Sequence, residues 1–208
     1  MSSLPPPHPK PQGGFTEIPS KRLLNSKLNT FEENKKSDFQ RFYQKGQLPC
    51  KINHGSVNNK LVWDQSANLD TMSFDPLILH FFDGLREKSH PYDFIVREAL
   101  KGLLSNENAK KRMLPLLGPA VEKLRLALGD STPSVFKNSL IALNALSECL
   151  GEDLNPHLKF LLSPISKNIA KKELRSHIME TLAIVEKNGG PSALAQIKIK
   201  IPTYVSTS

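Results

Sequence analysis

The sequence predicts an all-α fold in which helix pairs stack on one another as a solenoid. The same arrangement of apolar residues occurs twice, from Pro91 to Asp130 and from Pro133 into the Lys171–Lys172 region. The two copies are about 42 residues apart, which is the period of two-helix repeats. Within each copy the apolar residues recur every three or four positions and therefore lie on one stripe of a helix. A single helix pair cannot bury such a stripe, but the next pair can cover it.

Each copy is expected to contain two helices separated by a polar turn. The four apolar stripes run, in chain order, over residues 94–104, 114–128, 136–150 and 154–169. Pro119 and Pro164 fall inside the second helix of each copy. Because proline removes a backbone hydrogen bond from a helix, we expect a kink or a break at both positions.

Shorter elements precede the first copy. Residues 1–36 are rich in proline and lysine, and such a composition cannot offset the entropy of ordering, so we expect a disordered tail. Its few apolar residues are either incidental or form a docking segment that orders on a partner. The folded domain is expected over residues 37–208. Ser37 is a typical helix cap, and Gly46 is expected to end the short helix that follows.

A change of period follows this helix. Residues 49–63 alternate between apolar and polar and contain glycine and asparagine near the middle, which predicts a small extended or hairpin element. A strongly apolar helix then begins at Pro76 and includes Gly84. Glycine inside a helix costs about 1 kcal/mol relative to alanine, so either a close helix approach or a local kink is expected there.

The end of the chain carries a clear stop signal. A further helix over residues 174–185 is expected to end at Asn188-Gly189-Gly190, because glycine is the preferred residue just past a helix. Pro191 to Ile199 then predicts a short last helix.

An ordered set of motifs resembles a known family. The motifs are Phe39, Phe42-Tyr43, Gly46, Pro49, Trp63, Phe81-Phe82-Asp83-Gly84-Leu85, Pro91-Tyr92-Asp93-Phe94, Glu186, Gly189-Gly190 and Ile201-Pro202-Thr203-Tyr204. In this order and spacing they resemble the parkin co-regulated protein family over residues 39–204. The segments 54–57, 154–159 and 197–204 are similar to its parkin co-regulated protein-like branch.

The resemblance implies an armadillo/HEAT-type helical fold and a non-enzymatic role. It also implies a microtubule-associated protein of ciliary and flagellar axonemes, because the parent protein lies at the inner junction of the doublet. Two departures limit this transfer. The glycine-rich insertion before the parent's last long helix is absent here, since Ile169-Ala170 runs directly into Lys171-Lys172-Glu173. The proline-rich tail also differs from the parent's N-terminal region.

The sequence offers no recognisable catalytic, cofactor or metal motif. His80 with Asp83 and His177 with Glu180 have helical spacing that could chelate a metal, but each pair lacks a third ligand. Cys50 and Cys149 have no CxxC partner, which is typical of a reducing compartment. We therefore expect no enzyme, no cofactor and a cytoplasmic protein. No apolar run suggests a signal peptide or a membrane span.

The net charge of +8 and the pI of about 9.5 favour acidic partners. Two basic groups lie in expected turns between helices, and they are either merely solvated or form a ridge along one edge of the stack. These candidate protein-binding residues are Lys110, Lys111, Arg112, Lys167, Lys171, Lys172 and Arg175. Aromatic residues do not alternate with the basic ones, so nucleic acid is not the expected partner.

Two functions remain open from the sequence. The first is a protein-binding scaffold that acts as a structural adaptor on microtubules, with tubulin or axonemal proteins as partners. The second is a soluble cytoplasmic adaptor that binds a partner or chaperone without filament affinity and holds a helix or an extended peptide in a groove. Both require the same stacked helices, so the sequence does not separate them.

Overall fold

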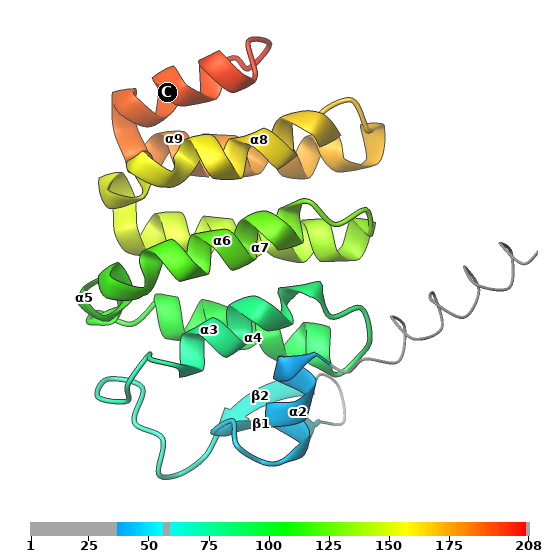
Figure 1. The fold of residues 1–208 in the computed structure, drawn as a ribbon, viewed down its shortest axis with the longest axis vertical. Helices are drawn as coiled ribbons and strands as arrows, with labels where there is room; N and C mark the ends of the chain where they lie inside the picture. The colour runs from blue at the N-terminus through cyan, green and yellow to red at the C-terminus, as the bar shows by residue number, and fades with distance from the viewer. Residues whose placement is uncertain (1–36, 56–58, 207–208) are drawn as a thin grey trace, which may run out of the picture. The chain divides into compact units, whose positions relative to one another are not determined.

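The computed structural model describes residues 37–55 and 59–206, and this part is mostly helical (Figure 1). The tail expected over residues 1–36 lies outside the described residues. One two-stranded antiparallel sheet is present in the described part. The predicted combination of a helical fold with a small hairpin is therefore confirmed. None of the described helices is long and apolar enough to span a bilayer.

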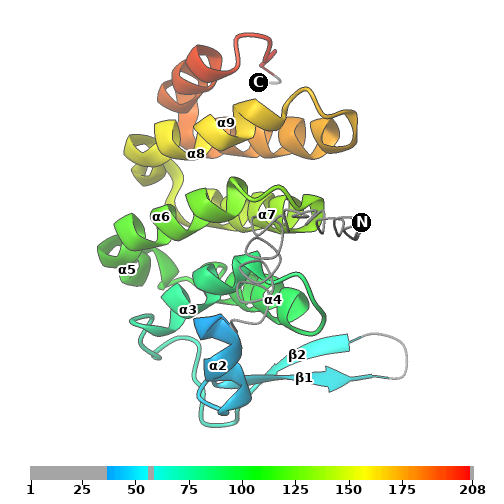
Figure 2. The same cartoon turned by 45° about the vertical axis from the view of Figure 1, so that its right-hand side comes forward.

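The hairpin and a short helix form the N-terminal layer (Figure 2). They comprise α2 (Asp38–Gln44), β1 (Cys50–His54) and β2 (Asn59–Trp63). Ser37 caps α2 as predicted, because its Oγ accepts a hydrogen bond from the backbone N–H of Gln40 at 3.0 Å. Gly46 follows α2 with a φ of +65°, a conformation that glycine adopts without strain. In the hairpin, Cys50 lies opposite Trp63 and His54 opposite Asn59.

Helix pairs continue from this layer, and their grouping differs from the two predicted copies, because the first helix of each copy packs against the helix that precedes it in the chain. They are α3 (Leu77–Asp83) with α4 (Tyr92–Leu104), α6 (Leu117–Leu128) with α7 (Pro133–Leu150), and α8 (Leu158–Asn168) with α9 (Lys172–Lys200). Figure 1 shows α3, α6 and α8 along one face and α4, α7 and α9 along the other. Neighbouring pairs contact one another through α3–α6 and α6–α8 on one side and through α4–α7 and α7–α9 on the other.

The apolar stripes point between the layers and form one continuous core. Phe136 and Leu143 of α7 are 1% and 0% exposed, and Leu124 of α6 is fully buried. Leu182 of α9 belongs to the same cluster. Each helix therefore depends on its neighbours for the burial of its apolar face, which is the main source of helix stability in proteins.

The start of the second helix differs from the prediction. Leu114 was expected on its buried stripe but lies in a 3₁₀ turn, Leu114–Leu116, and is 42% exposed. A separate short helix, α5 (Ala109–Met113), precedes this turn. Pro119 lies in the first turn of α6, where a missing N–H breaks no helical bond. Of the kink or break expected at Pro164, the break is wrong, because α8 continues through that residue.

The predicted stop near the end of the chain is confirmed as a sharp change of direction inside α9. Gly190 has φ +63° and ψ −157°, and Pro191 begins the last helical segment. The Asn155 side chain donates a hydrogen bond to the Gly189 carbonyl at 2.9 Å. Because a Cβ at Gly189 would lie 2.5 Å from Asn155 Oδ1, the bend requires glycine at this position.

Candidate functional site

The two predicted basic groups lie at opposite ends of the helix layers. Figure 1 places α5, which carries Lys110, Lys111 and Arg112, at the left and the turn between α8 and α9 at the right. The reason is topological. Turns inside a helix pair lie at one edge, whereas connections between pairs lie at the other. The groups therefore do not form a single strip.

Arg112 holds the preceding loop in place. Its Nη1 donates hydrogen bonds to the carbonyls of Leu69 at 2.8 Å and Met72 at 3.0 Å, and its Nη2 donates to Asn106 Oδ1 at 2.7 Å. The guanidinium also lies 4.2 Å from the centre of the buried Phe74 ring. These contacts occupy the donors that a partner would need.

Lys110 also forms an ion pair within the chain. Its Nζ lies 2.7 Å from Asp153 Oδ2, and this hydrogen bond raises the pKa of Lys110. Both side chains are about half exposed, so the pair contributes little to stability. It nevertheless joins α5 to the connection before α8. Lys111 is exposed and remains a candidate contact residue.

We expect Arg112→Ala to lower the free energy of unfolding by about 2 kcal/mol, because several loop carbonyls lose a charged donor. Arg112→Lys should recover little of the lost stability, since the lysine ammonium cannot reproduce the planar set of donors that the guanidinium presents. Lys111→Ala, one position earlier and exposed, is the matched control and should change stability by less than about 0.5 kcal/mol. Urea denaturation measures the free energy of unfolding of all three variants. Equal stability of the Arg112 and Lys111 variants would contradict the structural role of Arg112.

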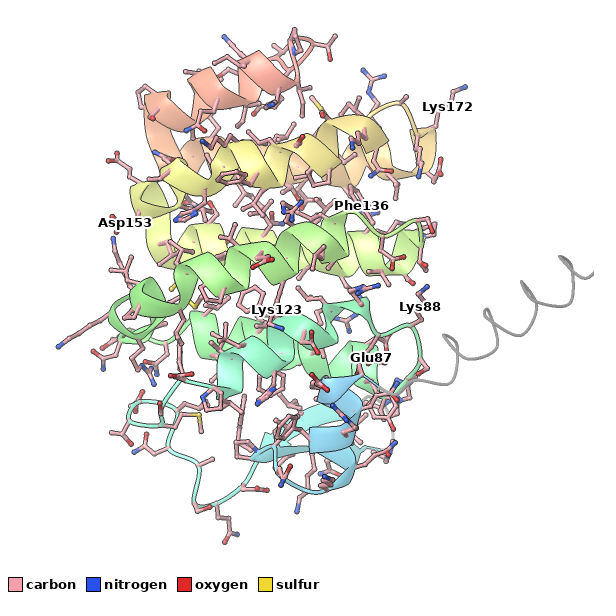
Figure 3. All side chains as sticks on the ribbon, viewed as in Figure 1. Glu87, Lys88, Lys123, Phe136, Asp153 and Lys172 are labelled. Carbon is pink, nitrogen blue, oxygen red and sulfur yellow. The ribbon has the colours of Figure 1, made fainter. Side chains whose placement is uncertain are left out.

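The C-terminal basic group belongs to a larger charged surface, here named the basic turn edge. It consists of exposed cations in or beside the turns inside the three helix pairs: Arg86, Lys88, Arg125, Lys167, Lys171, Lys172 and Arg175. Figure 3 shows Lys88 and Lys172 at the same edge of the layers and Asp153 at the other. The structure thus adds Arg86, Lys88 and Arg125 to the residues predicted from the sequence. Their common signal is a position in an intra-pair turn or in the last helical turn before it.

One carboxylate of this edge is held by local contacts. Asp130 Oδ1 accepts a hydrogen bond from the Thr132 backbone N–H at 2.8 Å and lies 3.9 Å from Lys88 Nζ. Burial raises the pKa of Asp130, but the hydrogen bonds from Thr132 and the charges of Lys88 and Arg86 together lower it below its usual value. Asp130 is therefore ionised at neutral pH and offsets part of the charge near the middle turn.

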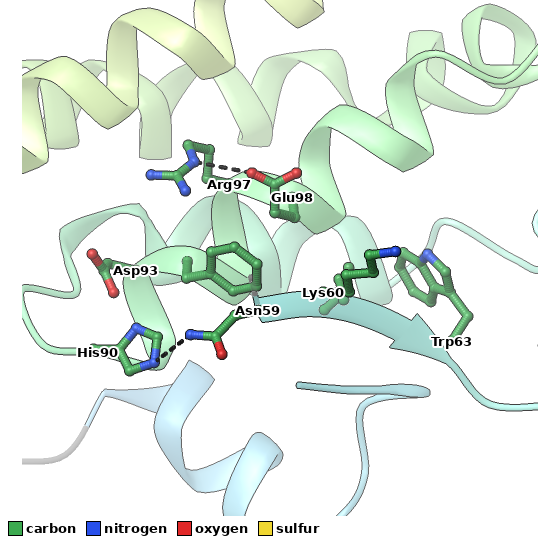
Figure 4. A pocket seen from close by; sticks show the side chains of 9 residues that line it. Asn59, Lys60, Trp63, His90, Asp93, Arg97 and Glu98 are labelled. Carbon is green, nitrogen blue, oxygen red and sulfur yellow. Dashed lines mark hydrogen bonds and ion pairs between the residues drawn. The ribbon is translucent and has the colours of Figure 1, made fainter. Parts of the chain in front are cut away.

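A second feature is a groove between β2 and α4, here named the β2–α4 groove (Figure 4). Its volume is about 750 Å³. The strand contributes Asn59, Lys60, Leu61 and Trp63, and the helix side contributes His90, Asp93, Phe94, Arg97 and Glu98. The helix-side residues follow the three- and four-residue spacing of one helix face. Lys60 and Arg97 balance Asp93 and Glu98 in formal charge.

The outer edge of β2 faces this groove with its main chain. The Asp64 N–H donates to the Pro49 carbonyl at 2.9 Å, so residue pairs 51–62 and 53–60 are the hydrogen-bonded pairs of the antiparallel ladder. The main-chain groups of Asn59, Leu61 and Trp63 consequently point away from β1. One Asp93 carboxylate oxygen is buried without a hydrogen-bond partner among the described residues.

The two cysteines are poorly suited to nucleophilic chemistry. Burial raises the pKa of Cys50 to about 12 and that of Cys149 to about 11. Both thiols are therefore protonated at neutral pH, and the thiolate is the reactive form. Within residues 37–55 and 59–206, no group of three or more His, Cys, Asp or Glu side chains could hold a metal ion.

Fold and surfaces together define a layered helical protein with a hairpin at one end, a basic edge and a strand-and-helix groove. The family profile described as Parkin co-regulated protein matches residues 37–206. The chain belongs to the Parkin co-regulated protein family. It is similar to the mouse (Mus musculus) Parkin coregulated gene protein homolog, with 29% identity over 191 residues that cover 83% of this chain and 77% of the mouse protein.

Proposed function

We propose that this chain is a non-enzymatic protein-binding scaffold with an armadillo/HEAT-like solenoid. In this proposal it acts as a structural adaptor on microtubules of the axoneme and is therefore cytoplasmic or ciliary. The observation that supports it most strongly is the basic turn edge, whose cations come from all three helix pairs. Stacking turns of one kind along one edge converts scattered charges into an extended surface. Membership of the family supports the same proposal.

An extended basic edge suits the acidic, exposed tails of tubulin. Opposite charges accelerate the encounter and orient the partners, whereas they contribute less to the final affinity. Salt screens exposed charges over about 8 Å at physiological ionic strength. Binding through this edge should therefore be strongest in dilute buffer.

We expect the purified chain to pellet with stabilised microtubules at low salt, and the bound fraction to fall by at least half as salt rises through the physiological range. Reversing Lys167, Lys171, Lys172 and Arg175 together should reduce pelleting at every salt concentration. Thermal stability should change little, because exposed charges contribute little to folding. A wild-type chain that stays in the supernatant at low salt would exclude direct filament binding by this chain.

The β2–α4 groove supports the second candidate function, a soluble adaptor that holds an extended peptide. A strand edge facing a helix can accept a third strand through main-chain hydrogen bonds. The balanced charge of the lining favours an uncharged peptide.

Leu61→Pro tests this second function. The substitution removes the outward N–H but no ladder bond to β1, so it should abolish peptide binding in the groove and leave the hairpin intact. The amide NMR signals of Asn59, Leu61 and Trp63 report the binding of peptides selected from a library.

A further inference from the structure

A serine hydroxyl and a buried carboxylate join the first helix to the turn before α4. Ser37 Oγ accepts a hydrogen bond from the Gln40 backbone N–H at 3.0 Å and donates one to Glu87 Oε1. Gln40 Nε2 donates to Glu87 Oε2 at 2.6 Å. Glu87 is only 8% exposed. Both oxygens of this carboxylate are thus bound by neutral donors from the first turn of α2 or from its cap.

This contact holds α2 against the rest of the N-terminal layer. Phe39, two residues after Ser37, is fully buried. Its ring lies 5.9 Å from the ring of Phe81 and 6.3 Å from that of Tyr92, measured between centroids. Phe42 and Tyr43 pack beside it and are partly buried. Any change that pushes Ser37 away from Glu87 therefore acts directly on a short helix with one fully buried side chain.

We propose that Ser37 is a phosphorylation site and that its phosphate releases α2 from Glu87. The Ser37 side chain is partly exposed, and Lys35 and Lys36 precede it in the sequence. A protein kinase that recognises basic residues before the acceptor would use a nucleoside triphosphate. The Ser37 oxygen forms a bond to the γ-phosphorus, the bond from that phosphorus to the β–γ bridging oxygen breaks, and the nucleoside diphosphate leaves. The hydroxyl proton passes to the base of the kinase.

Phosphorylation changes the contact with Glu87 from attraction to repulsion. The hydroxyl that donated to Oε1 is lost, and a group of charge −1.5 to −2 takes its place beside a buried carboxylate. A phosphate near a helix N-terminus is normally favourable because of the helix dipole. Here the repulsion acts at contact distance on a carboxylate that is only 8% exposed, whereas the dipole of the seven-residue α2 is small. The repulsion therefore prevails.

The test installs phosphoserine at position 37 of the full chain by genetic encoding and follows amide hydrogen exchange. We expect exchange in residues 39–44 to become at least tenfold faster, while α7 remains protected. In the Glu87→Gln background the acceleration should be several-fold smaller, because the opposing charge is gone. Phosphoserine at Ser176, an exposed residue of α9, is the matched control and should leave α2 unchanged.

Unchanged or slower exchange in α2 would overturn the proposed release. So would an equal acceleration with and without the Glu87 carboxylate, since the effect would then not arise from repulsion between the phosphate and Glu87.

A second experiment tests Ser37 as the phosphate acceptor. The folded full chain and a free peptide that spans residues 31–41 are each incubated with protein kinase C and a nucleoside triphosphate. Mass spectrometry should find phosphate on Ser37 in the folded chain. Absence of phosphate at Ser37 in the folded chain, whether or not the peptide is modified, would refute the site.

Discussion

Leu143→Asp should unfold the described domain. Leu143 lies in the middle of α7, has no exposed surface and belongs to the single core that joins the helix pairs. An aspartate there either buries an unpaired charge or takes up a proton, and it also leaves unfilled space. Together these effects cost more than about 4 kcal/mol, which approaches the whole stability of a typical domain.

The same helix provides the control for this variant. Ile141, two residues earlier, is 40% exposed, so Ile141→Asp should reduce stability by less than about 1 kcal/mol. Circular dichroism during thermal unfolding distinguishes the two outcomes. A folded Leu143→Asp protein with a melting temperature close to that of the Ile141→Asp protein would show that the α7 core has been assigned incorrectly.

Gly84→Ala should destabilise the protein clearly, although it adds only one methyl group. A Cβ at Gly84 would lie 2.6 Å from Val96 Cγ2 and 2.7 Å from Phe39 Cγ, both on buried side chains. The backbone is not the reason, because Gly84 has an ordinary φ of −67°. Relieving the clash requires α2 or α4 to move, and overpacking of this kind costs about 1–3 kcal/mol.

Gly102 is the matched control for Gly84. It lies inside α4, and the nearest atom to an added Cβ there is Trp63 Nε1 at 3.9 Å, an ordinary contact. Gly102→Ala should therefore stabilise the protein by about 0.5–1 kcal/mol, because alanine favours the helix. Urea denaturation should give opposite signs for the two variants. A Gly84→Ala protein as stable as wild type would contradict the close packing of α2, α3 and α4.

Local signals in the sequence predicted the elements whose ends depend on a few neighbouring residues. The Ser37 cap, the turn at Gly46 and the stop at Gly189-Gly190 are of this kind. The two explanations offered for Gly84 could not be separated from the sequence, since the close approach involves Phe39, 45 residues away in the chain. Leu114 was misassigned because its spacing fits the stripe, although a 3₁₀ turn rotates it outward.

The surfaces were harder to predict than the helices. Spacing identified basic residues in turns, but it does not state which edge of a layered fold a given turn occupies. Lys110 and Arg112 therefore resembled contact residues although they bind Asp153 and the loop carbonyls. Lys88 was overlooked because it lies between helices outside the two recognised copies. The β2–α4 groove requires a strand and a helix about 30 residues apart to come together, which no local pattern encodes.

Microtubule binding through the basic turn edge is the central claim, and two matched charge reversals test it most directly. Lys171→Glu with Lys172→Glu alters this edge, whereas Lys101→Glu with Lys187→Glu makes the same change of net charge at exposed positions near the opposite edge. Co-sedimentation with microtubules at low salt should give an apparent Kd about tenfold weaker for the first variant and nearly unchanged for the second. Equal affinity of both variants and wild type, or equal loss in both, would contradict binding through this edge.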